Sequence, residues 1–309
     1  MAVLQQILVL FLLIFVGVLT SKLNIVHSDF KKDLSKFLLY VTVPAFLITA
    51  MGANFTSENP VEVISNSYKL ILISLLMYAL AIALSFLLAK IFKFTIDERN
   101  VMQFSITFSN VAFMGYPIID IIYGSEGVFY AAIYNLTFNI LIWTLGVVLI
   151  TRGKSVNNNT NPWMKIINPG VVAIIIGFIL FIFNIQLPYA LGEGIRLVGN
   201  LTTPLAMIFI GLSLSDVSIM EIVSDYRGFV ISIFRLGIFP GIFYLVLSII
   251  GCEGYMLTIP VIISAMPVAI NGSMFAMTFE SDYVFASKLV FLSSFLSLIT
   301  IPLIIEFLA

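Results

Sequence analysis

The chain has little of the side-chain chemistry on which most hydrolytic enzymes depend. Among its 309 residues there is one cysteine, Cys252, and one histidine, His27. A single cysteine cannot form a disulfide framework or a cysteine metal cluster. The histidine lies in a polar connector, so no Ser–His pair is expected within an apolar segment, and no His-Glu-x-x-His motif occurs. We therefore expect no enzyme, no catalytic residues, no metal and no bound cofactor.

Charge is also scarce. Only 10% of the residues are charged and 61% are hydrophobic, with a mean hydropathy of +1.12. A soluble domain carries about 25% charged residues, so this composition indicates an integral membrane protein whose main partner is the lipid bilayer. The net charge of −1 argues against nucleic acid as a partner. A Gly-x-x-x-x-Gly-Lys-Ser/Thr motif is absent from the sequence, so ATP is not expected to drive the protein directly.

What the chain has in abundance is long apolar runs. A spanning helix needs about 20 predominantly apolar residues, and the sequence predicts an all-α protein with ten such spans. The predicted spans are 4–20, 37–53, 69–92, 101–123, 127–150, 168–186, 197–214, 228–250, 255–279 and 284–308. The first is read as a retained span and not as a signal peptide, because no basic segment precedes it. The polar connector 151–165 separates a first group of five spans, in 1–150, from a second group in 166–309.

Lysine and arginine lie mostly in the odd-numbered connectors between the predicted spans. These connectors and the span ends next to them hold 12 of the 15 basic residues, namely Lys22, Lys31, Lys32, Lys36, Lys90, Lys93, Arg99, Arg152, Lys154, Lys165, Arg227 and Lys288. Basic connectors stay in the cytoplasm. The bias therefore predicts a multi-pass protein of the cell membrane, either a plasma or an inner membrane, with both termini outside.

An internal repeat is visible when the sequence is shifted by 160 residues. The matching pairs include Gly17 with Gly177, Thr42 with Thr202, Pro44 with Pro204, Asp120 with Glu280, and Tyr123 with Tyr283. Because each half would hold five spans, an odd number, the second copy is expected to be inverted relative to the first. Inverted repeats are typical of secondary transporters, whose sites lie near mid-membrane on interrupted helices.

The stretch "SNVAFMGYPIID" (109–120) places polar and helix-breaking residues inside the fourth predicted span. Asn110 lies about 14 Å into that span at 1.5 Å per residue, close to the membrane centre. Gly115 and Pro117 are expected to break the helix, since proline lacks a backbone N–H and clashes with the carbonyl four residues back. Broken backbone at this depth is tolerated only inside protein or beside a watery cavity.

The ninth predicted span has a similar feature, with Pro267 near its middle and Asn271 shortly after it. Two broken helices in inverted halves are expected to cross. Their helix N-termini would favour an anion, and the asparagine amides would add donors. Ordinary proline kinks are the alternative for each span taken alone.

Five further residues are candidates for an ion site or for support of the substrate site. Tyr134, Asn135 and Asn139 lie in the fifth predicted span, where interhelical hydrogen bonding is an equal alternative. Asp120 and Arg235 are ionisable residues within spans, which makes each a functional candidate. Asp120 is alternatively an acid at the outer membrane interface. Arg235 could snorkel, pair with a carboxylate or bind an anionic substrate.

The residues of these two spans resemble the auxin efflux carrier family. "SNVAFMGYPII" is similar to that family's fourth-span motif, and "SAMPVAINGSMFAMTFESD" resembles its ninth-span motif. The resemblance implies a fold like that of bile-acid symporters and NhaA-type antiporters. Spans one, two, six and seven would form a scaffold, and spans three to five and eight to ten a transport domain. It also implies that Asn110, Gly115, Pro117 and Pro267 line the substrate site, to which the sequence adds Asn271.

We therefore expect a secondary active or potential-driven transporter of small organic anions, such as malate, malonate or auxin-like acids, working by alternating access. Coupling to H⁺ or Na⁺ remains open, with H⁺ or the membrane potential preferred. The alternative function is a receptor that binds such an anion without moving it. The family resemblance further implies a homodimer formed through spans two and seven.

Overall fold

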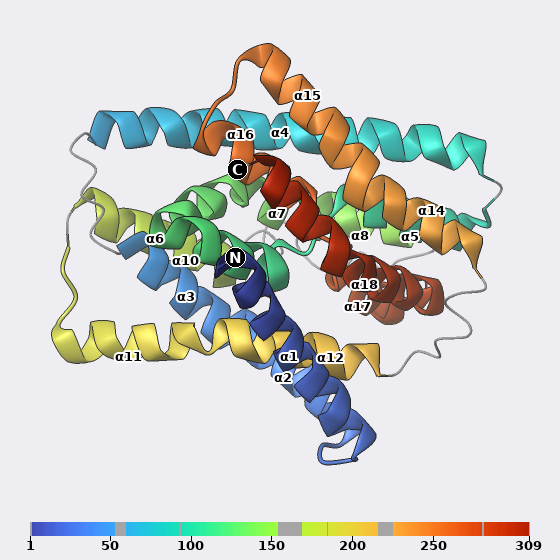
Figure 1. Cartoon of the computed structure of the whole chain (residues 1–309), viewed down its shortest axis with the longest axis horizontal. Helices are drawn as coiled ribbons and strands as arrows, with labels where there is room; N and C mark the ends of the chain where they lie inside the picture. Colours follow the sequence, from blue (N-terminus) through green and yellow to red (C-terminus); the bar gives the residue numbers. More distant parts are fainter. Residues whose placement is uncertain are drawn as a thin grey trace. The chain divides into compact units, whose positions relative to one another are not determined.

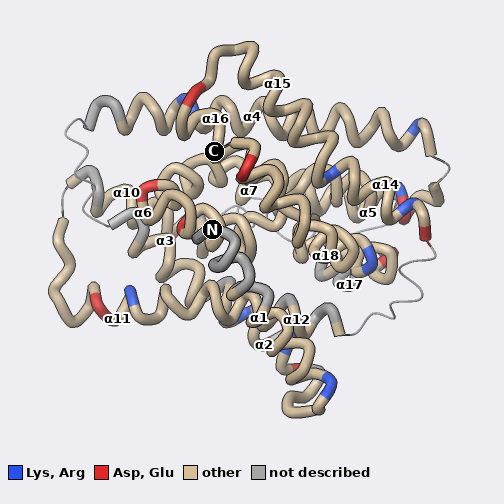
Figure 2. The backbone as a smooth tube through the Cα atoms, viewed as in Figure 1, with Lys and Arg blue, Asp and Glu red and all other residues tan. Residues whose placement is uncertain are grey.

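The computed structural model is helical throughout the part of the chain that it describes, apart from connecting segments and one isolated β-bridge (Figure 1). The structure describes residues 2–52, 60–92, 94–153, 169–183, 185–215, 225–279 and 281–308. Most of the predicted connector 151–165 and the repeat residue Glu280 lie outside these ranges. Figure 2 shows how few of the described residues are charged, in keeping with the composition.

The helices follow the apolar segments of the sequence. In the first half they are α1 (Ala2–Lys22), α2 (Ser28–Phe37), α3 (Val43–Gly52), α4 (Pro60–Ile91), α5 (Ile96–Thr107), α6 (Tyr116–Tyr134), α7 (Leu136–Leu141) and α8 (Val147–Thr151). In the second half they are α10 (Pro169–Ile182), α11 (Tyr189–Asn200), α12 (Thr202–Leu214), α14 (Tyr226–Ile233), α15 (Phe239–Ile250), α16 (Tyr255–Ser264), α17 (Asn271–Thr278) and α18 (Tyr283–Leu308). The described residues also form four wide π-helical turns: η1 (Leu38–Thr42), η2 (Val111–Gly115), η3 (Ile142–Gly146) and η4 (Phe234–Ile238).

Three of the described helical segments are long and apolar enough to cross a membrane on their own. They are Val63–Ile91, Tyr226–Ile250 and Tyr283–Leu308, and the bent pair Val111–Leu141 with Thr144–Thr151 makes a fourth if it counts as one span. Most other predicted spans fall on helices that are shorter or interrupted. The all-helical fold is thus confirmed, while the ten-span inverted repeat stays a prediction.

Three of the four π-helical turns begin six residues before a proline. The pairs are η1 with Pro44, η2 with Pro117, and η4 with Pro240. A proline in a helix removes one backbone donor, and its ring clashes with the carbonyl four residues back. Widening the preceding turn moves that carbonyl away, so the proline bends the segment without ending it.

The described chain divides into two compact units. Unit 1 comprises residues 1–68, 112–133 and 167–216, and unit 2 comprises residues 69–111, 134–166 and 217–309. In unit 1, α1 packs along α12, and α3 packs against α10 and α11. Gly17 and Gly211 allow the closest contact, because a Cβ added to Gly17 would lie 2.2 Å from the carbonyl oxygen of Ile208. Small residues at such contacts are typical of helix packing in membranes.

Unit 2 is built around α18, which packs against α5, α14, α16 and α17. Its interior is aromatic: the tilted rings of Phe104 and Phe108 lie 4.8 Å apart between centroids, and Phe275 meets Phe104 edge-on at 6.0 Å. All residues from Val101 to Val111 and from Ile259 to Ile270 are buried. These two buried segments contain the interrupted helices of the candidate site.

Candidate functional site: a buried crossover of two interrupted helices

The first interruption follows helix α5. A capping box begins this helix, with the Thr95 hydroxyl accepting from the Glu98 backbone N–H and the Glu98 carboxylate accepting from that of Thr95. The helix ends at Thr107, and Phe108 is extended at φ −110° and ψ 122°. The predicted break is present, but it precedes Asn110 and does not lie at Gly115 or Pro117. Pro117 is instead the second residue of α6, which continues directly from η2, and the widened turn of η2 accommodates its ring.

The second interruption follows helix α16. This helix ends at Ser264, and residues 265–270 connect it to α17, which begins at Asn271. Pro267 lies within that connection, as the sequence predicts. Pro260 is accommodated inside α16 itself, so only one of the two prolines of this segment coincides with a break.

The two interrupted segments pair with each other in an antiparallel β-bridge between Ser109 and Val268. The Asn110 backbone N–H donates to the Pro267 carbonyl at 2.8 Å, and the Ala269 N–H donates to the Phe108 carbonyl at 3.1 Å. The Val268 N–H donates to the Ser293 hydroxyl of α18 at 3.1 Å. Backbone groups that the broken helices leave without intrahelical partners are thereby satisfied inside the protein, as burial requires.

The crossover therefore brings together two of the residues that the sequence singles out, Asn110 and Pro267. Asn110 is 2% exposed. Asn271 is half-buried at the first position of α17, and its neighbour Gly272 faces Phe104 of α5 so closely that an added Cβ would lie 2.8 Å from the ring. Gly115 ends η2 and belongs with Pro117 to unit 1, so neither is placed relative to the crossover.

Arg235 is more deeply buried than the sequence indicates. It lies in η4 with 0% exposure, so its side chain does not snorkel to a surface of the chain. Its Nη1 donates to the carbonyl of Ser264, the last residue of α16, at 2.7 Å. The guanidinium carbon is 5.3 Å from the centre of the Phe239 ring. A full positive charge thus sits at the carbonyl end of one interrupted helix, where the helix dipole is negative.

The remaining candidates have separate surroundings. Tyr134 is fully buried and donates to the Met77 sulfur at 2.9 Å. Asn135 is buried between α6 and α7, and Asn139 donates from Nδ2 to the Asn135 carbonyl at 3.1 Å. That bond runs along a single helical turn. Asp120 is exposed in α6.

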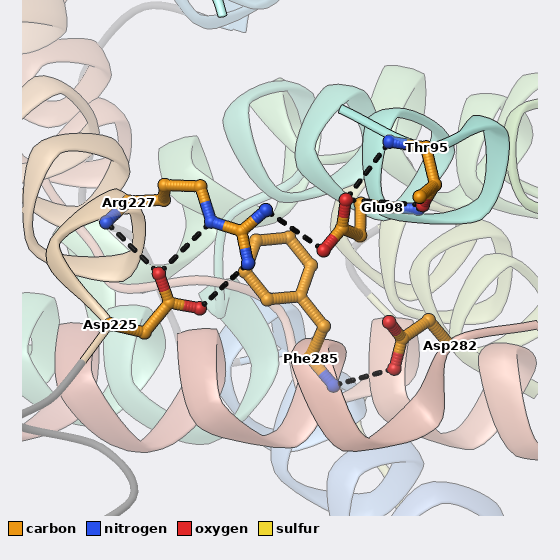
Figure 3. A network of polar contacts seen from close by, with 6 residues as sticks. All are labelled: Thr95, Glu98, Asp225, Arg227, Asp282 and Phe285. Carbon is orange, nitrogen blue, oxygen red and sulfur yellow. Dashed lines mark hydrogen bonds and ion pairs between the residues drawn. The ribbon is translucent and has the colours of Figure 1, made fainter. Parts of the chain in front are cut away.

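Sequence reasoning missed the polar cluster at the start of α5 and α14. In Figure 3 the Arg227 guanidinium lies between two carboxylates, with Nη1 donating to Glu98 at 2.9 Å and Nε donating to Asp225 at 3.0 Å. The Phe285 ring centre is 5.6 Å from the same guanidinium. The signal that could have revealed part of this cluster is the Thr-x-x-Glu spacing of the capping box.

Both carboxylates of this cluster are shifted toward the charged form. Burial raises the pKa of Glu98, but hydrogen bonds from Thr95 and the charge of Arg227 outweigh it, so the pKa lies below the ordinary 4.5. Burial likewise raises the pKa of Asp225, and the hydrogen bonds and charge of Arg227 bring it below the ordinary 3.8. The cluster is therefore fully ionised at neutral pH.

A second feature that sequence reasoning missed is polar burial along α5. Gln103 is 1% exposed, and neither atom of its side-chain amide has a hydrogen-bond partner among the described residues. The Ser109 hydroxyl at the crossover is likewise buried without a partner in that part of the chain. Donors and acceptors of this kind are suited to water or a polar ligand.

Comparison with known proteins agrees with the resemblance of the two motifs. A sequence model described as membrane transport protein matches residues 2–305. An uncharacterized transporter of Methanocaldococcus jannaschii is 24% identical over 303 residues, covering 96% of each chain. An uncharacterized transporter of Methanothermobacter thermautotrophicus is 23% identical over 303 residues, covering 97% of this chain and 96% of its own. With its membrane-type helices and nearly full-length match, the chain belongs to the membrane transport protein family that includes the auxin efflux carriers, and is a transporter and not an enzyme.

Proposed function

We propose that the protein is a secondary active or potential-driven transporter of small organic anions, with carboxylates such as malate, malonate or auxin-like acids as its substrate class. Alternating access would expose the crossover first to one side of the membrane and then to the other. The observation that carries the proposal is the bridge between Ser109 and Val268, which joins two interrupted helices inside a wholly buried segment. Interrupted helices at mid-membrane are the usual sites of secondary transporters.

The charges around the crossover support an anionic substrate. Arg235 lies at the crossover end of α16, and the described residues place no carboxylate in an ion pair with it. The N-terminus of α17 at Asn271 adds the partial positive charge of a helix start. Asn110, Asn271 and the buried Gln103 amide supply neutral donors.

The wider architecture of the proposal follows the ten predicted spans. Spans three to five and eight to ten, which include the crossover, would form the moving transport domain, and spans one, two, six and seven would form the scaffold. We further propose a homodimer through spans two and seven, cytoplasmic odd-numbered connectors, and coupling to H⁺ or the membrane potential in preference to Na⁺. The last preference rests on a site built from neutral amides and helix ends, with few carboxylates in or near the predicted spans.

A thermal-shift screen of the purified protein tests the substrate class. Malonate, malate and indole-3-acetate are each added in sodium chloride or choline chloride buffer, with malonamide as the uncharged counterpart of malonate. A ligand at 100 times its Kd adds about 2.7 kcal/mol to the unfolding free energy. We expect at least one carboxylate, and not malonamide, to raise the melting temperature, and we expect this to occur without sodium. Failure of all three acids would contradict the proposal.

A receptor that binds the anion without moving it is the second candidate. Membership of a transporter family argues against it. Binding experiments give the same result for both candidates, so only an exchange experiment in vesicles separates them.

A further inference from the structure

Two of the three donor nitrogens of Arg235 have no acceptor among the described residues. Nη1 donates to the Ser264 carbonyl, whereas Nε and Nη2 are buried without a hydrogen-bond partner among the described residues. The Phe239 ring lies against the guanidinium, with 5.3 Å between the guanidinium carbon and the ring centre. This ring is uncharged, and none of the described residues forms an ion pair with Arg235, so the cation is not neutralised. A buried guanidinium with unmade hydrogen bonds is costly, which makes it a strong receptor for an anion.

The unused donors form one particular edge of the guanidinium. Nε and Nη2 point their N–H groups in parallel, and this pair matches the two oxygens of a carboxylate. Two other arginines of this chain use the same edge. Arg196 donates to Glu193 from Nε at 2.8 Å and from Nη2 at 2.5 Å, and Arg227 donates to Asp225 at 3.0 Å and 3.2 Å.

The third donor fixes the orientation of that edge. Because Nη1 is held by the Ser264 carbonyl, rotation of the guanidinium would break the bond to α16. Ser264 is also joined to the crossover by the chain itself, since Val268 of the β-bridge follows it by four residues. A ligand on Arg235 would therefore act directly on the end of an interrupted helix.

We propose that the Nε and Nη2 edge of Arg235 binds a carboxylate of the transported anion, while Nη1 stays on the Ser264 carbonyl. This inference rests on the proposed function and adds to it the group that recognises the substrate's charge. It also predicts selectivity, because a substrate must carry at least one carboxylate. An ester or amide of the same skeleton is neutral and does not offer two equivalent, negatively charged oxygens to the two donors. Arginine and lysine are not equivalent here, because lysine has no parallel pair of donors.

Isothermal titration of malonate into the purified full-length protein tests the proposal. Arg235→Lys keeps the positive charge near Ser264 but removes the parallel donors, and we expect its Kd for malonate to rise about tenfold or more. Arg227→Lys is the matched control, since the corresponding edge of Arg227 is already occupied by Asp225. The Kd of Arg227→Lys for malonate is expected to stay within about twofold of the wild-type value, because Arg227 makes no contact with malonate that the substitution could remove.

Each outcome has a definite consequence. Equal malonate affinity in the wild type and in Arg235→Lys would overturn the inference and leave the proposed function intact. If the wild type binds none of malonate, malate and indole-3-acetate, the proposed function fails and the inference fails with it. Should Arg235→Lys not fold, an experimental structure of the wild type with malonate decides. A carboxylate about 3 Å from both Nε and Nη2 supports the inference, and malonate bound elsewhere overturns it.

Discussion

Two buried asparagines, Asn110 at the crossover and Asn100 within α5, allow a ligand-binding role to be distinguished from a structural one. Asn110 lies at the crossover, where its backbone N–H, and not its side chain, makes the bond to Pro267. Asn100 lies near the start of α5, and its Nδ2 donates to the Arg152 carbonyl at 2.9 Å. Replacement by alanine removes only the side-chain amide in each case, so the β-bridge is kept in both variants.

We expect Asn110→Ala to weaken binding of the carboxylate about ten- to hundredfold, because a hydrogen bond to a charged group contributes roughly 1.5–3 kcal/mol. Its melting temperature should change little. Asn100→Ala should show the reverse, with a loss of about 1–3 kcal/mol in unfolding free energy and an unchanged Kd. Titration and thermal unfolding are measured on the same preparations. If Asn110→Ala instead kept the wild-type Kd but melted at a lower temperature, the role of Asn110 would be structural.

At the scale of helices, the cluster of Glu98, Asp225 and Arg227 holds the starts of α5 and α14 together. Each side chain is less than a third exposed, so screening by solvent is limited. Because the folded-state pKa of both carboxylates is depressed, their stabilisation is complete above the unfolded-state values and is lost as the pH falls below them.

We therefore expect the melting temperature to be level above about pH 5 and to fall at lower pH, with this cluster contributing about 1 kcal/mol of the loss. The double variant Glu98→Gln, Asp225→Asn keeps both helix caps, since glutamine and asparagine serve at those positions. It should lose part of the pH dependence and be less stable at pH 7. Identical pH profiles for the wild type and the variant would show that the cluster does not stabilise the fold.

The contact between α1 and α12 gives a second prediction for helix packing. Gly17→Ala would place a Cβ against the Ile208 carbonyl, which is backbone and cannot turn aside. We expect a loss of about 1–3 kcal/mol in stability, as for other overpacked sites. Gly194→Ala in α11 is the control, because nothing lies within 4 Å of its added Cβ. This control should be neutral or more stable by up to about 1 kcal/mol, since alanine favours helix over glycine. A Gly17→Ala protein as stable as its control would contradict the close packing.

Helix position and helix interruption could be predicted because both depend on local sequence. The apolar runs predicted which segments are helical, and Pro267 correctly predicted the position of the second break. The first break was misplaced because Pro117 was taken as a helix breaker, whereas the widened turn η2 before it lets the helix continue into α6. Whether a proline bends a helix or ends it depends on the position of the carbonyl four residues back, which the sequence does not give.

Burial of individual charges could not be predicted in the same way. Arg235 and Arg227 lie eight residues apart in the sequence, yet one is fully buried at the end of α16 and the other takes part in an ion-pair cluster. Their partners, Ser264 and Glu98, come from distant parts of the chain. Such contacts depend on tertiary packing, which residue type and helical period do not encode.

At the scale of the whole molecule, the predicted topology is tested by the single natural cysteine. Cys252 lies between α15 and α16 and is partly exposed. The charge bias places this connector outside and the connector 151–165 in the cytoplasm. A membrane-impermeant maleimide should label Cys252 in intact cells, whereas Asn158→Cys on a Cys252→Ser background should be labelled only after the cells are opened. Ready labelling of the cysteine at position 158 from outside would contradict the orientation and the inverted repeat with it.

Counterflow in proteoliposomes is the most direct measurement of transport. Vesicles holding the purified protein are loaded with the unlabelled carboxylate that binds best and are diluted into a trace of the same labelled compound. A carrier that works by alternating access should concentrate the label inside transiently and saturably, and Asn110→Ala should abolish this uptake. Saturable binding to the wild-type protein without any exchange of label would identify a receptor and contradict transport.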